Sequence, residues 1–451
     1  MMKRILSLLL IAVLLAFAIP ALAEEDAHKA FAVQYATDLM GGQKNEELYA
    51  MFTDAVKAQL PRETFDGVWG QIASMFGDFQ GFGSFSVREA QGYETCFLTL
   101  DMSKQDLLMQ LTLDPSGKVA GFFITQAPVQ QDAAAEQAEL PAGIVEEDIS
   151  VGEGEWALGG TLTLPETGSN FPAVVLVQGS GASDRNEAVG GTKFFRDIAW
   201  AFAQKGIAVL RYDKRTFAHS DLFTKEVQLS FTVKEETVDD AVLAGKLLKA
   251  DARINGSKIF LLGHSMGAML GSRIAAQGEG LFAGMILVSG TPLLLTDIII
   301  AQNEDVLSKL TVEQQAQQQP LLDAEIEKVN ALYQMTPEEA KQETVFGLPG
   351  YYFYEMKQYD APALLLDLKL PTLILQGGED FQVSVENGLD AWEKALGAPD
   401  FVTYKLYPEL NHLMMKYTGD PALQYTLQEY NTPANMDGTV ASDMINWILA
   451  H

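Results

Sequence analysis

The chain has 451 residues, 48% of them hydrophobic and 20% charged, a globular composition on a length that usually needs more than one hydrophobic core. Its formal net charge of −29 at pH 7 repels nucleic-acid phosphates and so argues against a nucleic-acid partner. Cys96 is the only cysteine, which excludes an intramolecular disulfide and a thiolate-rich metal site. Its apolar neighbours favour a buried thiol over a nucleophile.

The first residues are typical of an export signal. Lys3 and Arg4 give a positive start, Ile5–Ile19 is almost wholly apolar, and Ala21-Leu22-Ala23 is an A-x-A cleavage pattern. We therefore predict a signal peptide over residues 1–23 and a secreted or cell-envelope protein without stable membrane insertion after cleavage. An uncleaved N-terminal anchor is the alternative interpretation.

Residues 26–126 predict a small α+β domain whose function the sequence does not reveal. Helical spacing runs from about Asp26 to Tyr49 with a break at Gly41-Gly42, and a second helix begins at Pro61. Strands then follow as an antiparallel meander, which makes a layer for the helices to cover. The predicted strands are Ser84–Arg88, Tyr93–Asp101, Gln105–Leu113 and Lys118–Thr125.

Residues 127–142 begin with a stretch rich in Ala, Gln and Glu and predict a linker. From residue 143 to 451 strands and helices alternate, which predicts an α/β domain: a mostly parallel sheet with helices on both faces. The predicted strands cover residues 173–177, 207–210, 258–262, 285–288, 372–375 and 402–407, and the main helices residues 194–202, 237–249, 268–277 and 441–449.

One segment interrupts this alternation. Between Ser289 and Pro371 lie roughly eighty residues without a clear sheet strand, too many for an ordinary loop. We predict a helical cap inserted at about residues 291–370. Its aromatic cluster Tyr351–Tyr354 either shapes an apolar acyl pocket or packs the cap onto the core.

The sequence Gly263-His264-Ser265-Met266-Gly267 has the layout of a nucleophile elbow. An apolar strand ends at Leu262, and a helix with small residues follows. The two glycines allow the tight turn, which exposes the Ser265 hydroxyl above the positive end of the helix. An ordinary glycine-rich strand-helix turn is the alternative interpretation.

A serine nucleophile needs a base, and the chain has five histidines. His412 is the only one late in the chain after the last predicted strand, as the order Ser, acid, His requires. His264 lies within the elbow, where its side chain should point away from that of Ser265. The remaining candidates are badly placed: His28, His219 and His451.

The acid that orients the base should follow a buried strand. Leu373–Gln376 is such a strand, and Asp380 has the expected spacing after it, with the adjacent Glu379 as the alternative. Asp297 and Asp367 are weaker candidates because neither follows such a strand.

The reaction also needs hydrogen-bond donors for the oxyanion. One should be the backbone N–H of Met266, the residue after the nucleophile, and the other should come from the loop that begins at Gln178. In that loop Ser180 is the first candidate and Gly181 the second. Glycines that merely turn the chain are the alternative interpretation.

Residues from about 143 to 451 resemble bacterial α/β hydrolases of the esterase and dienelactone-hydrolase-like group, and residues 27–126 resemble the small domain of unknown function that often precedes such hydrolases in exported bacterial proteins. The resemblance implies the same triad of Ser265, Asp380 and His412. Four sequence blocks carry it: Gln178–Gly181 with Asp184-Arg185, Arg211–Arg215, the elbow, and Gln376–Asp380 with Asn411-His412.

This chain departs from its relatives in two places. Gln178 stands where relatives commonly have a histidine that supports the oxyanion loop, so the triad is unaffected. Thr216–Ser220 replaces a Gly-x-Gly turn, which alters the rim of the site. A polar network that supports the structure is expected from the charged residues near this rim: Asp184, Arg185, Asp213 and Arg215.

These observations predict a secreted serine hydrolase, specifically a carboxylesterase that cleaves small acyl esters through an acyl-enzyme intermediate. The small-molecule ester is its only predicted partner, and no metal or organic cofactor is expected. A peptidase or aminopeptidase with the same triad, a thioesterase, and a non-catalytic envelope-binding protein are the alternatives. The sequence does not predict an oligomeric state.

Overall fold

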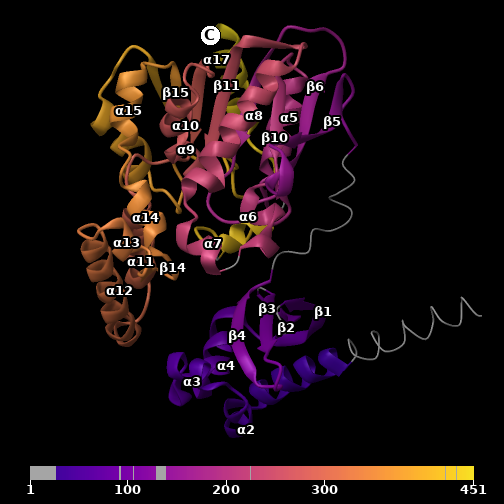
Figure 1. Cartoon of the computed structure of the whole chain (residues 1–451), viewed down its shortest axis with the longest axis vertical. Coiled ribbons are helices and arrows are strands. Elements are labelled where there is room, and N and C mark those ends of the chain that lie inside the picture. The colour runs from indigo at the N-terminus through magenta and orange to yellow at the C-terminus, as the bar shows by residue number, and fades with distance from the viewer. Residues whose placement is uncertain are drawn as a thin grey trace, which may run out of the picture. The chain divides into compact units, whose positions relative to one another are not determined.

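The structure is a computed structural model in which the chain divides into two compact units, residues 1–130 and 131–451 (Figure 1). The predicted signal peptide over residues 1–23 lies outside the described residues, as does most of the predicted linker. The described residues are 27–90, 93–104, 106–127, 139–223, 225–421, 423–432 and 434–451.

The first unit packs helices against a four-stranded antiparallel sheet of order β1-β2-β3-β4. Buried apolar residues, including Cys96 at 1% exposure, fill the space between the two layers. After a helix over residues 27–41, its elements are α2 (Asn45–Ala50), α3 (Asp54–Gln59), α4 (Arg62–Phe76), β1 (Phe79–Ala90), β2 (Tyr93–Met102), β3 (Leu107–Leu113) and β4 (Val119–Gln126).

Strand β1 begins at Phe79 and not at Ser84, the predicted start. Its pairing with β2 shifts register between Phe79 and Gly81 and again between Phe82 and Phe85. Such bulges break the alternation of side chains on which a sequence-based strand prediction depends.

The second unit is built on a mostly parallel eight-stranded sheet, as the alternating pattern predicted. Six strands run parallel, and β6 and β5 add an antiparallel edge that the sequence analysis did not identify. In sheet order the strands are β16 (Val402–Tyr407), β15 (Thr372–Gly377), β12 (Gly284–Val288), β11 (Ile254–His264), β7 (Phe171–Val177), β10 (Ala208–Tyr212), β6 (Leu158–Pro165) and β5 (Ile144–Val151).

Helices cover both faces of this sheet (Figure 1) and create two separate hydrophobic cores. On one face lie α5 (Phe194–Ala203) and α17 (Gly438–Ala450), whose apolar residues pack with the side chains of one sheet face. The other face is covered by α8 (Asp239–Ala250), α10 (Gly271–Gln277) and α16 (Ala391–Leu396). This arrangement is the doubly covered parallel sheet expected of an α/β domain.

The insertion between β12 and β15 is helical, as expected for a cap, and has a small apolar core of its own around Leu332 and Phe353. Its elements are α11 (Leu295–Ser308), α12 (Val312–Leu332), α13 (Pro337–Ala340), the hairpin β13 (Thr344–Val345) and β14 (Leu348–Pro349), α14 (Gly350–Met356) and α15 (Ala361–Leu368). No helix within the described ranges combines the length and the apolar character needed to cross a membrane.

Short elements complete the connections. They are η2 (Gly154–Trp156), the hairpin β8 (Ala188–Val189) and β9 (Thr192–Lys193), α6 (Arg215–Ala218), η3 (Ser220–Leu222), α7 (Lys225–Ser230), the π-helical turn η4 (Lys234–Val238), α9 (Met266–Met269), the π-helical turn η5 (Glu386–Asp390) and η6 (Leu427–Asn431).

Candidate active site

Ser265 occupies a sharp turn between β11 and α9. Its φ of +53° and ψ of −114° lie outside the regions that non-glycine residues prefer, so the surrounding structure must hold the turn in place. A Cβ at Gly263 would lie 2.3 Å from the carbonyl oxygen of Gly267, and one at Gly267 would lie 2.2 Å from that of Val177. Both positions therefore require glycine, and the strand-turn-helix geometry is that of the predicted elbow.

His412 and Asp380 form a buried pair on the loops that follow β16 and β15. The distance from His412 Nδ1 to Asp380 Oδ2 is 2.8 Å, and both residues are almost fully buried. Asp380 Oδ2 also accepts a hydrogen bond from Gln376 Nε2, and Oδ1 accepts from the backbone N–H groups of Gln382 and Val383. These bonds fix both carboxylate oxygens, so the imidazole of His412 has a defined orientation.

Glu379, the alternative acid, has a different environment. Its carboxylate accepts a hydrogen bond from the Tyr425 hydroxyl, and the residue lines a separate cavity of about 150 Å³ together with Asn411 and Glu429. The imidazole of His412 is therefore paired with Asp380 and not with its neighbour.

The elbow and the His412 loop are joined through His264. The two imidazole rings lie 4.8 Å apart, and His264 Nε2 is 3.1 Å from the carbonyl oxygen of His412. The Ser289 hydroxyl donates to the same carbonyl at 2.8 Å. The fold thus places Ser265, His412 and Asp380 after the carboxyl ends of three parallel strands of one sheet, β11, β16 and β15, the edge where α/β proteins bind their ligands.

Glu187 is a buried residue of this site that the sequence analysis did not identify. Its Oε1 lies 2.9 Å from His264 Nδ1 and accepts a hydrogen bond of 2.6 Å from the backbone N–H of Gly179. Burial disfavours a charged imidazole, but the Glu187 carboxylate outweighs it and raises the pKa of His264 above its ordinary value. The partners are 77 positions apart, so no local pattern could have revealed the pair.

The predicted oxyanion loop lies directly against Ser265. A Cβ at Gly179 would be 3.1 Å from the Cβ of Ser265, so the loop passes beside the serine. The N–H of Gly179 is already bonded to Glu187, which leaves the N–H of Ser180 as the next donor along the chain. Gly181 follows with a φ of +85°, and Met266 begins α9, where an N–H has no acceptor within its own helix.

The charged residues near the rim are held by separate ion pairs and by backbone hydrogen bonds. Arg185 pairs with Asp213 at 2.7 Å, and Arg215 pairs with Asp240. Asp184 accepts hydrogen bonds from the N–H groups of two residues that follow it in the same loop. These contacts are internal to the protein, which supports the structural interpretation.

The two departures from the family pattern are also explained by contacts. The side-chain amide of Gln178 donates to the carbonyl oxygen of Tyr212 and so connects the ends of two strands. His219, in the altered rim, bonds the carbonyl oxygen of Ala157 at 2.9 Å and packs edge-on against Trp156. Phe217 in the same segment is half exposed.

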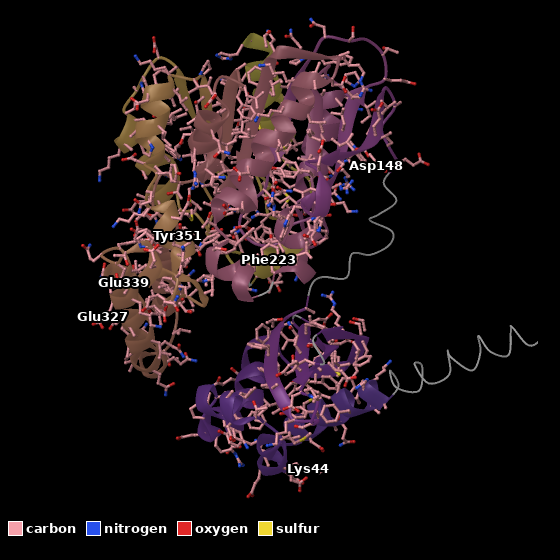
Figure 2. All side chains as sticks on the ribbon, viewed as in Figure 1. Lys44, Asp148, Phe223, Glu327, Glu339 and Tyr351 are labelled. Atoms are coloured by element: carbon pink, nitrogen blue, oxygen red, sulfur yellow. The ribbon has the colours of Figure 1, made fainter. Side chains whose placement is uncertain are left out.

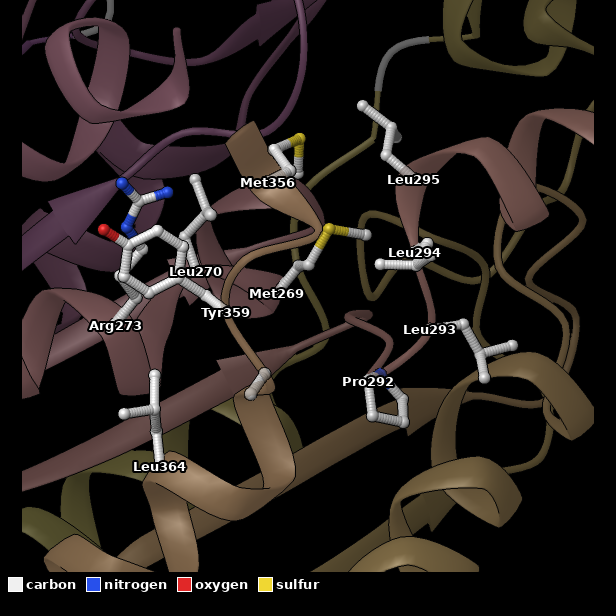
Figure 3. Close-up of a pocket in the computed structure, with 11 residues that line it drawn as sticks. Met269, Leu270, Arg273, Pro292, Leu293, Leu294, Leu295, Met356, Tyr359 and Leu364 are labelled. Carbon is white, nitrogen blue, oxygen red and sulfur yellow. The ribbon is translucent and has the colours of Figure 1, made fainter. Parts of the chain in front are cut away.

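Two cavities lie between the core and the cap. A small apolar one of about 40 Å³ (Figure 3) is bounded by Met269, Leu270 and Leu293, with the guanidinium of Arg273 stacked 3.6 Å from the ring centroid of Tyr359. A larger one of about 380 Å³ has mostly polar walls that include Lys309 of α11 and residues following Asp380.

The aromatic cluster Tyr351–Tyr354 lines neither of these cavities. Phe353 is buried in the cap core, the rings of Tyr351 and Tyr354 stack on each other, and Figure 2 marks Tyr351 on α14. The contacts of Phe353, Tyr351 and Tyr354 are packing contacts of the cap. Within the described ranges no cluster of three or more His, Cys, Asp or Glu residues has a geometry suited to a metal ion.

A strained serine elbow on a mostly parallel sheet, covered by a helical cap, defines the α/β-hydrolase class of serine hydrolases. The chain belongs to this family: residues 189–418 match the family model described as serine aminopeptidase, S33. Esterase EstD of Thermotoga maritima is 32% identical over 405 residues, which cover 90% of this chain and 91% of that protein. Residues 35–122 match a family described as protein of unknown function, DUF3887.

Two solved structures are also similar. The dienelactone hydrolase of Anabaena variabilis aligns with a TM-score of 0.40 at 17% identity and covers 68% of this chain and 99% of that one. Est1E of Butyrivibrio proteoclasticus aligns with a TM-score of 0.41 at 14% identity and covers 67% of this chain and 99% of that one. The family match identifies the chain as an enzyme, a serine hydrolase.

Proposed function

We propose that the protein is an exported carboxylesterase that cleaves small acyl esters with Ser265 as nucleophile, His412 as base and Asp380 as the orienting acid. The observation that carries the proposal is the buried His412–Asp380 pair, held at 2.8 Å beside the serine elbow. The name of the relative from Thermotoga maritima, an esterase, supports ester chemistry. Export rests on the signal peptide predicted for residues 1–23.

In the first step the Ser265 hydroxyl attacks the ester carbonyl while His412 Nε2 accepts its proton. The N–H groups of Met266 and Ser180 stabilise the negative charge that develops on the carbonyl oxygen. His412 then returns the proton to the departing alcohol. In the second step His412 activates a water molecule, which attacks the acyl-enzyme and releases the carboxylic acid.

The smaller, apolar cavity supports a small apolar acyl group. The 40 Å³ cavity is lined by Met269, which lies one helical turn after the nucleophile, and its walls are largely apolar. A cavity of this size accommodates only a few heavy atoms, so esters of short acids fit better than long-chain lipids. A panel of p-nitrophenyl esters from acetate to decanoate should show the highest kcat/KM for the shorter acyl groups.

A fluorophosphonate probe tests the nucleophile. We expect the wild-type protein to be labelled and Ser265→Ala to be unlabelled, and His412→Ala should lose turnover of p-nitrophenyl acetate. An unlabelled wild-type protein, or equal labelling of Ser265→Ala, would favour a non-catalytic envelope-binding protein. Full activity of His412→Ala would refute the assignment of the base.

The description of the family model favours a second candidate, an aminopeptidase with the same triad. Such an enzyme needs an unpaired anionic group for the substrate ammonium. The acidic cavity near the site includes Glu409 and Glu429, but Lys416 pairs with the first and Asn411 donates to the second. Faster cleavage of aminoacyl p-nitroanilides than of p-nitrophenyl acyl esters would establish the aminopeptidase.

A further inference from the structure

Lys214 is a buried lysine beside the proposed oxyanion loop, and the proposed mechanism does not use it directly. Its side chain is 2% exposed and follows β10. Nζ donates a 2.7 Å hydrogen bond to the carbonyl oxygen of Gly179 and lies 3.0 Å from Glu236 Oε1. Burying a lysine removes its ammonium group from water at a large cost in free energy, so a position like this needs a specific explanation.

The bond to Gly179 determines where the next N–H points. The carbonyl of Gly179 and the N–H of Ser180 belong to one peptide unit, which is planar and trans. In such a unit the C=O and N–H bonds point in opposite directions. With its oxygen on Lys214, the unit must therefore direct the Ser180 N–H away from the ammonium group.

The hydrogen bond from Lys214 is needed because the residue that it holds, Gly179, is a glycine. A glycine peptide can rotate between orientations that other residues cannot adopt, so Gly179 alone would not hold the Ser180 N–H in one direction. The N–H of Gly179 is bonded to Glu187 and its carbonyl to Lys214, so both polar atoms of the residue are held by buried charged groups.

The same chain of contacts reaches the cap. Glu236, on the π-helical turn η4, accepts a 2.6 Å hydrogen bond from the Tyr352 hydroxyl of α14. That hydroxyl lies 3.6 Å from the sulfur of Met266, the residue expected to supply the other oxyanion donor. Burial raises the pKa of Tyr352 well above its ordinary value, so the phenol stays protonated and donates.

We propose that Lys214 is a positioning residue that holds the Gly179–Ser180 peptide so that the Ser180 N–H faces the oxyanion, and that Glu236 and Tyr352 extend this support to the cap. The inference rests on the proposed function, because it concerns the oxyanion of the same acyl transfer. A group that acts on an oxyanion donor matters more in the transition state than in the bound substrate.

The test uses the full chain with Lys214→Met combined with Glu236→Gln, so that no buried carboxylate is left unpaired. We expect kcat for p-nitrophenyl acetate to fall by about 10- to 1000-fold, the range for loss of one oxyanion donor, while KM changes by less than about threefold. Inhibition by a trifluoromethyl ketone, which forms a tetrahedral adduct on the serine, should weaken by a similar factor.

Lys234→Met is the matched control. Lys234 lies on the same π-helical turn but pairs with Asp239 near the surface, so its loss should leave kcat within twofold of wild type. Tyr352→Phe, which removes a single hydroxyl group, should lower kcat of the wild-type protein by about three- to tenfold. Added to the Lys214→Met, Glu236→Gln double variant, the same substitution should lower kcat by less, because all these changes act through one chain of contacts.

A folded double variant with wild-type kcat and wild-type inhibitor affinity overturns the proposal, as does a rise in KM with kcat unchanged. If the double variant does not fold, Tyr352→Phe decides, and unchanged kcat in that variant is the refuting result. Failure of the proposed function is distinguishable, because it would appear as an unlabelled wild-type protein or as an active or equally labelled Ser265→Ala protein.

Discussion

Replacing Asp380 by asparagine should abolish most activity without unfolding the protein. The carboxylate accepts four hydrogen bonds, two on each oxygen, and an asparagine of the same shape can accept on one side only. Its NH₂ group must face either the backbone N–H groups of Gln382 and Val383 or the side chains of Gln376 and His412.

The second orientation is the less costly one. Placing the NH₂ group against the two backbone donors leaves both unsatisfied, at about 1–3 kcal/mol each. When the asparagine NH₂ group faces His412, it can donate to Nδ1 if the imidazole proton moves to Nε2. Only the hydrogen bond from Gln376 is then lost. A proton on Nε2 prevents His412 from accepting the Ser265 proton, so kcat should fall by about 10³- to 10⁴-fold, as in the corresponding aspartate replacement of trypsin-like proteases.

The assay is the initial rate on p-nitrophenyl acetate, with thermal unfolding by circular dichroism as the control for folding. Stability should fall by about 1–3 kcal/mol, which the fold tolerates. Glu379→Gln is the matched variant: it makes the same chemical change one residue away and should keep activity within a few-fold of wild type. Loss of activity in Glu379→Gln with an active Asp380→Asn would refute the assignment of the acid.

Three further predictions concern stability and reactivity. Gly267→Ala should destabilise the fold by several kcal/mol in urea unfolding, because its methyl group would lie 2.2 Å from a backbone oxygen. Gly256→Ala, with no neighbour closer than 3.5 Å, should be near neutral. Equal effects of the two substitutions would contradict the argument that the elbow requires Gly267. Because the pKa of His264 is raised in the folded state, its ion pair with Glu187 stabilises that state fully below pH 6.5 and is lost as the pH rises through the folded-state pKa. The Tm difference between wild type and Glu187→Gln should therefore shrink from pH 6 to pH 9. A constant difference would show that His264 does not titrate in this range. Burial raises the pKa of Cys96 to about 11, so Ellman's reagent should react only after unfolding, and rapid reaction of the native protein would disprove its burial.

The sequence predicted those parts of the fold that depend on local periodicity. Strand β16 coincides with the predicted segment 402–407, and the segment without sheet strands is a helical cap. Two strands were missed, because Ile144–Val151 and Leu158–Pro165 pair antiparallel with each other and have no helix between them. A strand's direction depends on its neighbours in space, and no local pattern records it.

The candidate site shows the same limit. Elimination among five histidines selected His412, and the structure places its imidazole on Asp380. Glu187 and Lys214 could not be found in this way, because their roles depend on hydrogen bonds to the backbone of Gly179 that no pattern in the sequence records. A single glutamate or lysine forms no motif in the sequence, and only the folded structure shows which backbone groups these two side chains bond.

The buried pairs around the elbow, each formed by a carboxylate with a histidine or a lysine, share one arrangement that stability alone does not explain. A buried ion pair contributes little to stability, and replacing it by apolar residues of similar size is often neutral. Here, however, each pair also bonds the backbone of a loop near Ser265. The proposed oxyanion loop is bonded by two pairs, and the loops that carry the proposed acid and base are each bonded by one. Directional hydrogen bonds restrain loop geometry in a way that apolar packing cannot, so we infer that these pairs orient the loops. The pairs are His412–Asp380, His264–Glu187 and Lys214–Glu236.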